Sequence, residues 1–160
     1  MSAEDLSRLL EGLSESAQAL RKEAESVGQV IDSVQTRLNG MNLGVEVWLE
    51  DQPLRTRELS VSASNVAPRI EVQLGFAPLW MHGKEQWCLQ LREAEYGPQA
   101  ISGEGEQFKL SRIHKQQALS ECSKPDQVAA LSILPALIQK LTTATQEQMR
   151  TLRDSKKLLE

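Results

Sequence analysis

Hydrophobic positions in the first forty residues recur with the seven-residue period of a coiled-coil helix. They form two interleaved series, which are Leu6, Leu13, Leu20, Val27, Val34 and Met41, and Leu10, Ala17, Ala24, Ile31 and Leu38. With the second series at the a positions and the first at d, every core position is filled over about five heptads. The pattern predicts one long helix over residues 3–40. We expect it to stop at Asn39-Gly40, because these residues readily form a left-handed cap.

A second helical pattern occupies the end of the chain. Ser123 precedes Lys124, Pro125 and Asp126, which gives an N-cap serine, a first-turn proline and an early acid. Apolar residues then follow helical spacing, at Val128, Leu131, Leu134, Ile138, Leu141, Thr145, Met149, Leu152 and Leu159. We predict a long helix over residues 123–160. Pro135 lies inside it and should kink it, because proline removes a backbone donor and crowds the preceding turn.

Residues 41–122, between the two helical patterns, read as β structure. All six aromatic residues lie here, and apolar residues alternate with polar ones over 45–50, 69–76 and 86–92. Weaker alternation near 59–61 and 108–110 suggests further strands, with turns at 51–53, 81–84 and Gly97-Pro98. The sequence therefore predicts a single α+β domain, in which an antiparallel four- to five-stranded β meander forms a head flanked by two long helices.

Charge along the chain bears on how the two helices pair. The first helix begins with acids and the last ends with bases, at Glu4, Asp5, Glu11 and Glu15, and at Arg150, Arg153, Lys156 and Lys157. Each helix also complements its own dipole in this way. An antiparallel hairpin would bring the two clusters together, and we expect that arrangement. A parallel zipper between the first helices of two copies, and an ordinary amphipathic core helix, are the alternatives.

The apolar surface exceeds what one chain is expected to cover. If the helices bury their stripes on each other, the apolar face of the sheet needs another cover. The candidates are the proximal ends of the helices, the segment Ile113–Leu119 or a second copy of the chain. We therefore expect at least a homodimer.

Composition excludes several classes of function. The 160 residues carry a net charge of -4, which does not favour nucleic-acid binding. The longest nearly apolar run, Ala129–Ile138, is too short to span a bilayer. The first residues resemble no signal peptide, and two cysteines are too few for a disulfide scaffold, so we expect a cytoplasmic protein.

No motif specifies a reaction, a cofactor or a metal. Two histidines and two cysteines match the ligand types of a zinc site but not its spacing; they are His82, His114, Cys88 and Cys122. The glutamates of the strands alternate with apolar residues, as on a solvated sheet face. We therefore assign no catalytic, cofactor-binding or metal-binding residue, and we expect the protein not to be an enzyme.

Two tryptophans are the candidate partner-binding residues. Trp48 lies between Glu46 and Glu50, on the strand face where polar residues are expected, and Trp80 lies near the predicted turn at 81–84. Tryptophan is enriched at interface hot spots. The plain alternative for Trp48 is that a helix or loop covers it.

Two long helices joined through β structure resemble prefoldin in outline, with a larger β segment. The small acidic composition resembles that of bacterial secretion chaperones, although the long leading helix departs from their plan. These resemblances imply a chaperone-like role and identify no functional residue. The sequence favours a non-catalytic, oligomeric interaction or scaffold protein that binds itself and another protein. The alternative is a ligand-binding or enzymatic β head that uses Trp48, Trp80, His82 or Cys88.

Overall fold

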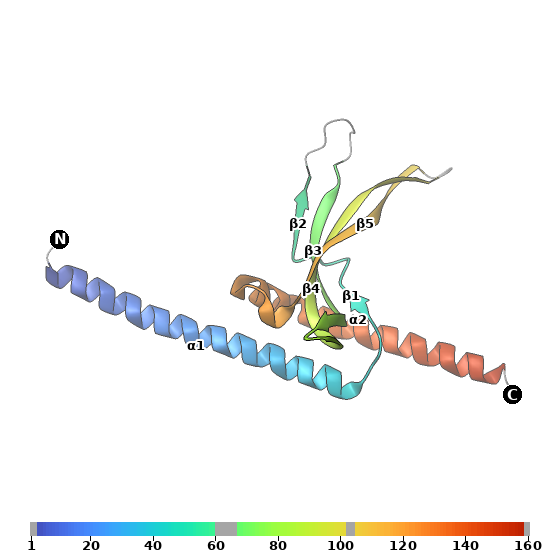
Figure 1. Ribbon diagram of the computed structural model, residues 1–160, viewed down its shortest axis with the longest axis horizontal. Coiled ribbons are helices and arrows are strands. Elements are labelled where there is room, and N and C mark those ends of the chain that lie inside the picture. Colours follow the sequence, from blue (N-terminus) through green and yellow to red (C-terminus); the bar gives the residue numbers. More distant parts are fainter. Residues whose placement is uncertain (1–2, 60–66, 102–104, 159–160) are drawn as a thin grey trace.

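The computed structural model describes residues 3–59, 67–101 and 105–158 as two long helices and a five-stranded antiparallel sheet (Figure 1). In chain order the elements are α1 (Ala3–Met41), β1 (Val47–Trp48), β2 (Arg55–Glu58), β3 (Arg69–Met81), β4 (Lys84–Ile101), β5 (Gly105–Ala118), the 3-10 turn η1 (Leu119–Glu121) and α2 (Lys124–Lys157). The predicted α+β class with an antiparallel sheet is confirmed. Of the weak strand predicted near residues 59–61, residues 60 and 61 lie outside the described residues.

Helix ends follow local chemistry. α2 begins where the sequence indicates, because the Ser123 side chain accepts a hydrogen bond from the Asp126 backbone N–H. α1 ends at Met41, one residue beyond the predicted end at residue 40, and Asn42, with φ of 49°, takes the left-handed conformation instead of Asn39 or Gly40. The helix of α2 runs through Pro135. The kink at that residue stays a prediction.

The sheet is built around the β3–β4 hairpin. These strands pair without interruption from Arg69 opposite Tyr96 to Met81 opposite Lys84. His82 and Gly83, both with positive φ, form the two-residue turn between them, as the sequence predicts. β5 continues the meander beyond β4, and the short strands β1 and β2 both pair with the other edge of β3.

The turn predicted at Gly97-Pro98 is wrong, because both residues lie within β4. The pairing between β3 and β4 begins at Arg69 opposite Tyr96, so β4 has only β5 as its described neighbour beyond that point. A proline has no N–H to contribute to a ladder, and a stretch paired on one side only can accommodate it. The position of Pro98 is therefore explained by where β3 starts.

One face of the sheet is covered by the proximal ends of both helices. The core joins Ile31 and Leu38 of α1 to Leu134, Leu137 and Leu141 of α2. Beneath them lie the inward residues of the strands, which include Val72, Leu74, Phe76, Leu89 and Leu91. Of the covers considered from the sequence, the helix ends fill this role. Of the Ile113–Leu119 segment, which belongs mainly to β5, Leu119 joins the core.

The antiparallel helix hairpin does not form within this chain. Lys124, at the start of α2, places its Nζ 3.8 Å from the point where a Cβ on Gly28 of α1 would lie. Further along both helices, Leu38 of α1 and Leu141 of α2 line the same groove. The two helices therefore pass each other in the same direction, and in Figure 1 their free ends lie on opposite sides. The proximal halves of α1 and α2 overlap each other on the same face of the sheet instead of meeting end to end, so the remaining halves project in opposite directions.

The remaining halves of the helices project from the core. Every described residue from Glu4 to Glu23 is exposed, as is every described residue from Gln146 to Leu158. We call residues 4–23 the free half of α1 and residues 142–157 the distal half of α2. The extended coiled coil expected from the heptads does not form between the described residues of one chain.

Candidate functional site

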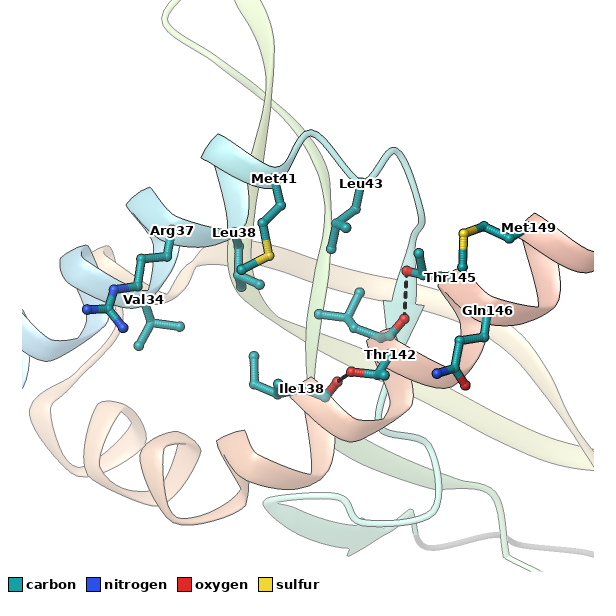
Figure 2. A pocket seen from close by; sticks show the side chains of 11 residues that line it. Val34, Arg37, Leu38, Met41, Leu43, Ile138, Thr142, Thr145, Gln146 and Met149 are labelled. Atoms are coloured by element: carbon teal, nitrogen blue, oxygen red, sulfur yellow. Dashed lines mark hydrogen bonds between the residues drawn. The ribbon is translucent and has the colours of Figure 1, made fainter.

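A groove opens where α1 ends beside α2, and we call it the fork groove (Figure 2). Its volume is about 560 Å³. Its lining residues are Val34, Arg37, Leu38, Met41, Leu43, Ile138, Leu141, Thr142, Thr145, Gln146 and Met149. They come from the last turns of α1, the loop that follows it and the middle of α2. Seven of the eleven are large aliphatic residues or methionines, so the groove is suited to apolar side chains.

The two threonines of the groove offer no free hydroxyl hydrogen to an occupant. The Thr142 hydroxyl donates to the Ile138 carbonyl at 2.9 Å, and the Thr145 hydroxyl donates to the Leu141 carbonyl at 2.8 Å (Figure 2). Each hydroxyl is thus satisfied by its own helix. An apolar group bound there would therefore leave no hydroxyl hydrogen without an acceptor. The threonine methyl groups add to the apolar lining.

Arg37 is the only titratable residue among those that line the groove. Figure 2 shows its guanidinium pointing away from the centre. Acid–base catalysis needs a positioned proton donor or acceptor, and nucleophilic catalysis needs an activated nucleophile. Arg37 is not positioned as either, and the other lining residues carry no titratable side chain.

Apolar side chains are exposed along both projecting helices, and those of α2 continue from the groove. On the free half of α1 the exposed leucines are Leu6, Leu9, Leu10, Leu13 and Leu20, with exposed fractions from 47% to 71%. On the distal half of α2, Met149 and Leu152 extend the stripe of Ile138, Leu141 and Thr145 at intervals of three or four residues. Exposed apolar stripes of this kind are candidate interaction surfaces.

Trp48 is buried on the sheet face opposite the helices. Its ring lies directly on Gly75, where an added Cβ would come within 2.2 Å of Trp48 Cε3. Arg92 stacks on the same ring, with its Cζ 4.2 Å from the centroid, and the indole N–H donates to Glu46 at 2.7 Å. Only 7% of Trp48 is exposed, so it offers little area to a partner in this conformation.

Polar residues buried on that same face were missed in the sequence, where they read as a solvated surface. Gln73, fully buried, donates to Glu71 at 3.0 Å and to the Tyr96 hydroxyl at 2.8 Å. Arg92 donates to Gln73 at 2.9 Å and to Glu50 at 2.9 Å. These hydrogen bonds offset the cost of burying polar groups. Alternation alone predicts the shared face but not its burial.

Trp80 has the opposite environment, with 71% of its surface exposed. It lies near the end of β3, two residues before His82 of the hairpin turn. A tryptophan so exposed can insert into a partner without any change in the fold. Of the two tryptophans singled out in the sequence, Trp80 is therefore the accessible one.

The cysteines and histidines are not brought together as a reactive site. Burial raises the pKa of the Cys88 thiol to about 11, with a smaller effect of Glu121. Burial also raises the pKa of Cys122 to about 11, so both are mainly protonated thiols near neutral pH. His82 is exposed in its turn, and His114 pairs with Glu95 on the neighbouring strand. Within the described ranges no three His, Cys, Asp or Glu side chains could hold a metal ion together.

The residues of the alternative β-head site are likewise dispersed. Trp48 and Cys88 lie on the face opposite the helices, whereas Trp80 and His82 lie at the hairpin end. The sequence did not predict the fork groove. The signal available was the pair Met41 and Met149, each on the apolar side of its helix, but nothing in the sequence shows that the two meet.

By length and composition, α2 is the one described helix that is long and apolar enough to cross a membrane, and 22% of its most apolar window is buried inside the protein. Core helices of water-soluble proteins pass the same test. This property alone therefore does not distinguish a core helix from a spanning one.

Comparison of the chain with family models, with curated proteins and with solved structures finds no match.

Proposed function

We propose that the protein is a non-catalytic, homo-oligomeric interaction or scaffold protein with a chaperone-like mode of action. Its projecting helices serve self-association through coiled-coil contacts, and its β head, with Trp80, contacts another protein. The observation that carries the proposal is the free half of α1, whose five leucines are exposed in one chain.

The free half of α1 has a physical need for a partner. A helix held by no tertiary contact is marginal at this length, because most helical stability in proteins comes from packing of an apolar face. Each fully buried leucine contributes roughly 1.5–3 kcal/mol. Burying Leu6, Leu10, Leu13 and Leu20 against a partner would therefore contribute several kcal/mol of stability that the isolated chain lacks.

Small-ligand binding is the second candidate function. The fork groove, at about 560 Å³, falls within the range of small-molecule sites and is largely apolar. It lies between the helices, so this candidate moves the site from the β head. If an apolar fluorescent dye competes with self-association, the groove serves the contact between copies. If the dye binds equally to monomer and oligomer, the groove is instead a site for a small ligand.

The molecular mass in solution tests the proposal. Light scattering at micromolar concentration should give at least twice the 17.8 kDa of one chain. Leu20→Glu should shift the mass toward that of the monomer, because it places a charge in the exposed stripe. Lys22→Glu, on an exposed and polar position of the same helix, is the matched control and should leave the mass unchanged. A wild-type monomer would refute self-association.

A further inference from the structure

The two projecting helix halves of this protein have matching apolar spacing and opposite charge, yet one chain cannot join them. We propose that the free half of α1 from a second copy lies antiparallel along the distal half of α2. In this arrangement Leu20 of the second copy enters the fork groove. The inference rests on the proposed self-association and specifies its geometry.

The apolar stripes match in period and extent. The free half of α1 has leucines at heptad spacing, with the small residue Ala17 between Leu13 and Leu20. The receiving helix presents Thr142, Thr145, Met149 and Leu152, which repeat every three or four residues. At 1.5 Å per residue the two halves are roughly 30 Å and 24 Å long. An antiparallel register that sets Leu13 beside Met149 to Leu152 also sets Leu20 near Thr142.

The fork groove is built for an aliphatic side chain at this point. Its threonine hydroxyls are bonded to their own helix, so an inserted leucine leaves no polar hydrogen without a partner. Leu20 is the most exposed leucine of the free half, at 71%. Leu38 and Leu141 form the buried side of the groove and would complete the cover of the inserted residue.

Charge fixes the direction. Residues 3–15 carry a net charge of -3, from Glu4, Asp5, Glu11 and Glu15 against Arg8; residues 150–157 carry +3, from Arg150, Arg153, Lys156 and Lys157 against Asp154. Antiparallel contact brings these segments together, whereas a parallel zipper of two α1 helices would place acid against acid. Within one chain the two segments lie at opposite ends of the molecule (Figure 1). The second copy is therefore the source of the matching charge.

If a two-fold axis relates the two copies, their contacts form a closed dimer. The free half of α1 in each copy would cover the distal half of α2 in the other, so both stripes are buried by the same operation. This is an isologous dimer, with no unpaired helix left to recruit a third copy.

Crosslinking between differently tagged chains tests the geometry. Cys88 and Cys122 are first replaced by alanine, then Leu13→Cys is placed in one chain and Leu152→Cys in the other. Oxidation of the mixture should yield a disulfide between the two tags. Leu13→Cys alone and Leu152→Cys alone should yield little crosslinked dimer. Efficient Leu13–Leu13 crosslinking in a dimeric protein would overturn the antiparallel geometry while leaving self-association intact. A monomeric mass would overturn both and leave the stripe to another protein or a lipid surface.

Charge reversal supplies a second readout that does not depend on a disulfide. The pair Glu11→Arg and Glu15→Arg should raise the dimer dissociation constant about tenfold at low salt, since exposed charge pairs contribute modest energies. Adding Arg150→Glu and Arg153→Glu should restore the wild-type dissociation constant. Failure of the second pair to rescue the first would overturn the proposed contact, even for a dimeric protein.

Discussion

The free half of α1 and the following stretch at residues 27–41 share one helix and one heptad pattern but have contrasting surroundings. Ile31 is fully buried against the sheet, whereas Leu20, eleven residues earlier, is 71% exposed. The helix continues through both without a break. The difference shows that a heptad pattern identifies a face that is to be buried, and leaves open whether the cover is a sheet, a second helix or another chain.

The largest effect should come from charging the buried stretch. Ile31→Glu places an unpaired carboxylate in the core, which costs at least about 3–5 kcal/mol and would leave little of the fold. Leu20→Glu should retain the wild-type circular dichroism of the sheet and lose only assembly. Thermal melts of both variants at low protein concentration measure the contrast. Equal loss of melting temperature would mean that the free half of α1 is covered within the chain after all.

The two tryptophans extend the comparison to the β head. Gly75→Ala should cost roughly 1–3 kcal/mol, because its Cβ would overlap the Trp48 ring. Trp48→Ala should cost about 3–5 kcal/mol, and the double variant should cost no more than Trp48→Ala alone. Trp80→Ala should stay within about 0.5 kcal/mol of the wild type. Urea unfolding of the four variants provides these values, and additive costs at Gly75 and Trp48 would argue against their direct contact.

Amide hydrogen exchange can sharpen the contrast along α1 itself. Protection at residues 4–23 should rise with protein concentration, because the free half is stabilised only by assembly. Protection near Ile31 and Leu38 should change little, since those residues are buried in each chain. Mass spectrometry of peptic peptides at two concentrations separates the segments. Concentration-independent protection at residues 4–23 would show that this half needs no second copy.

The smallest predicted effect is at the start of α2. A hydrogen bond from Arg55 holds the pKa of Asp126 below its ordinary value of 3.8, with a further contribution from Ser123. A lowered pKa stabilises the fold above pH 3.8, and this contribution disappears as the pH falls through the folded-state value. Because Arg55 is largely exposed, the pair contributes at most about 1 kcal/mol. Asp126→Asn should remove this part of the acid sensitivity, which denaturation between pH 5 and roughly pH 2 would reveal.

The sequence predicts those features that depend on neighbouring residues. The start of α2 follows from Ser123 and Pro125, and the β3–β4 turn follows from Gly83 and its flanking alternation. Features that depend on distant residues were not predictable. A covered Trp48 was one alternative, but its packing on Gly75 depends on the pairing with another strand, and the strand position of Pro98 depends on where β3 begins. The common direction of the helices depends on the sheet that separates them in the sequence and that both cover on one face, and no helical period encodes it.

The placement of α1 beside α2 also has a kinetic consequence. Ile31 packs in the same core as Leu137, more than a hundred residues later in the chain. Contacts so distant in sequence form slowly, because a long loop must close before they contribute. Until the sheet and α2 have both formed, Ile31 and Leu38 are as uncovered as Leu20, and the whole of α1 presents one continuous apolar stripe to other nascent or refolding chains. Refolding yield should therefore fall as protein concentration rises, and the docking of α1 with the sheet and α2 is the step that limits α1 to its correct partners.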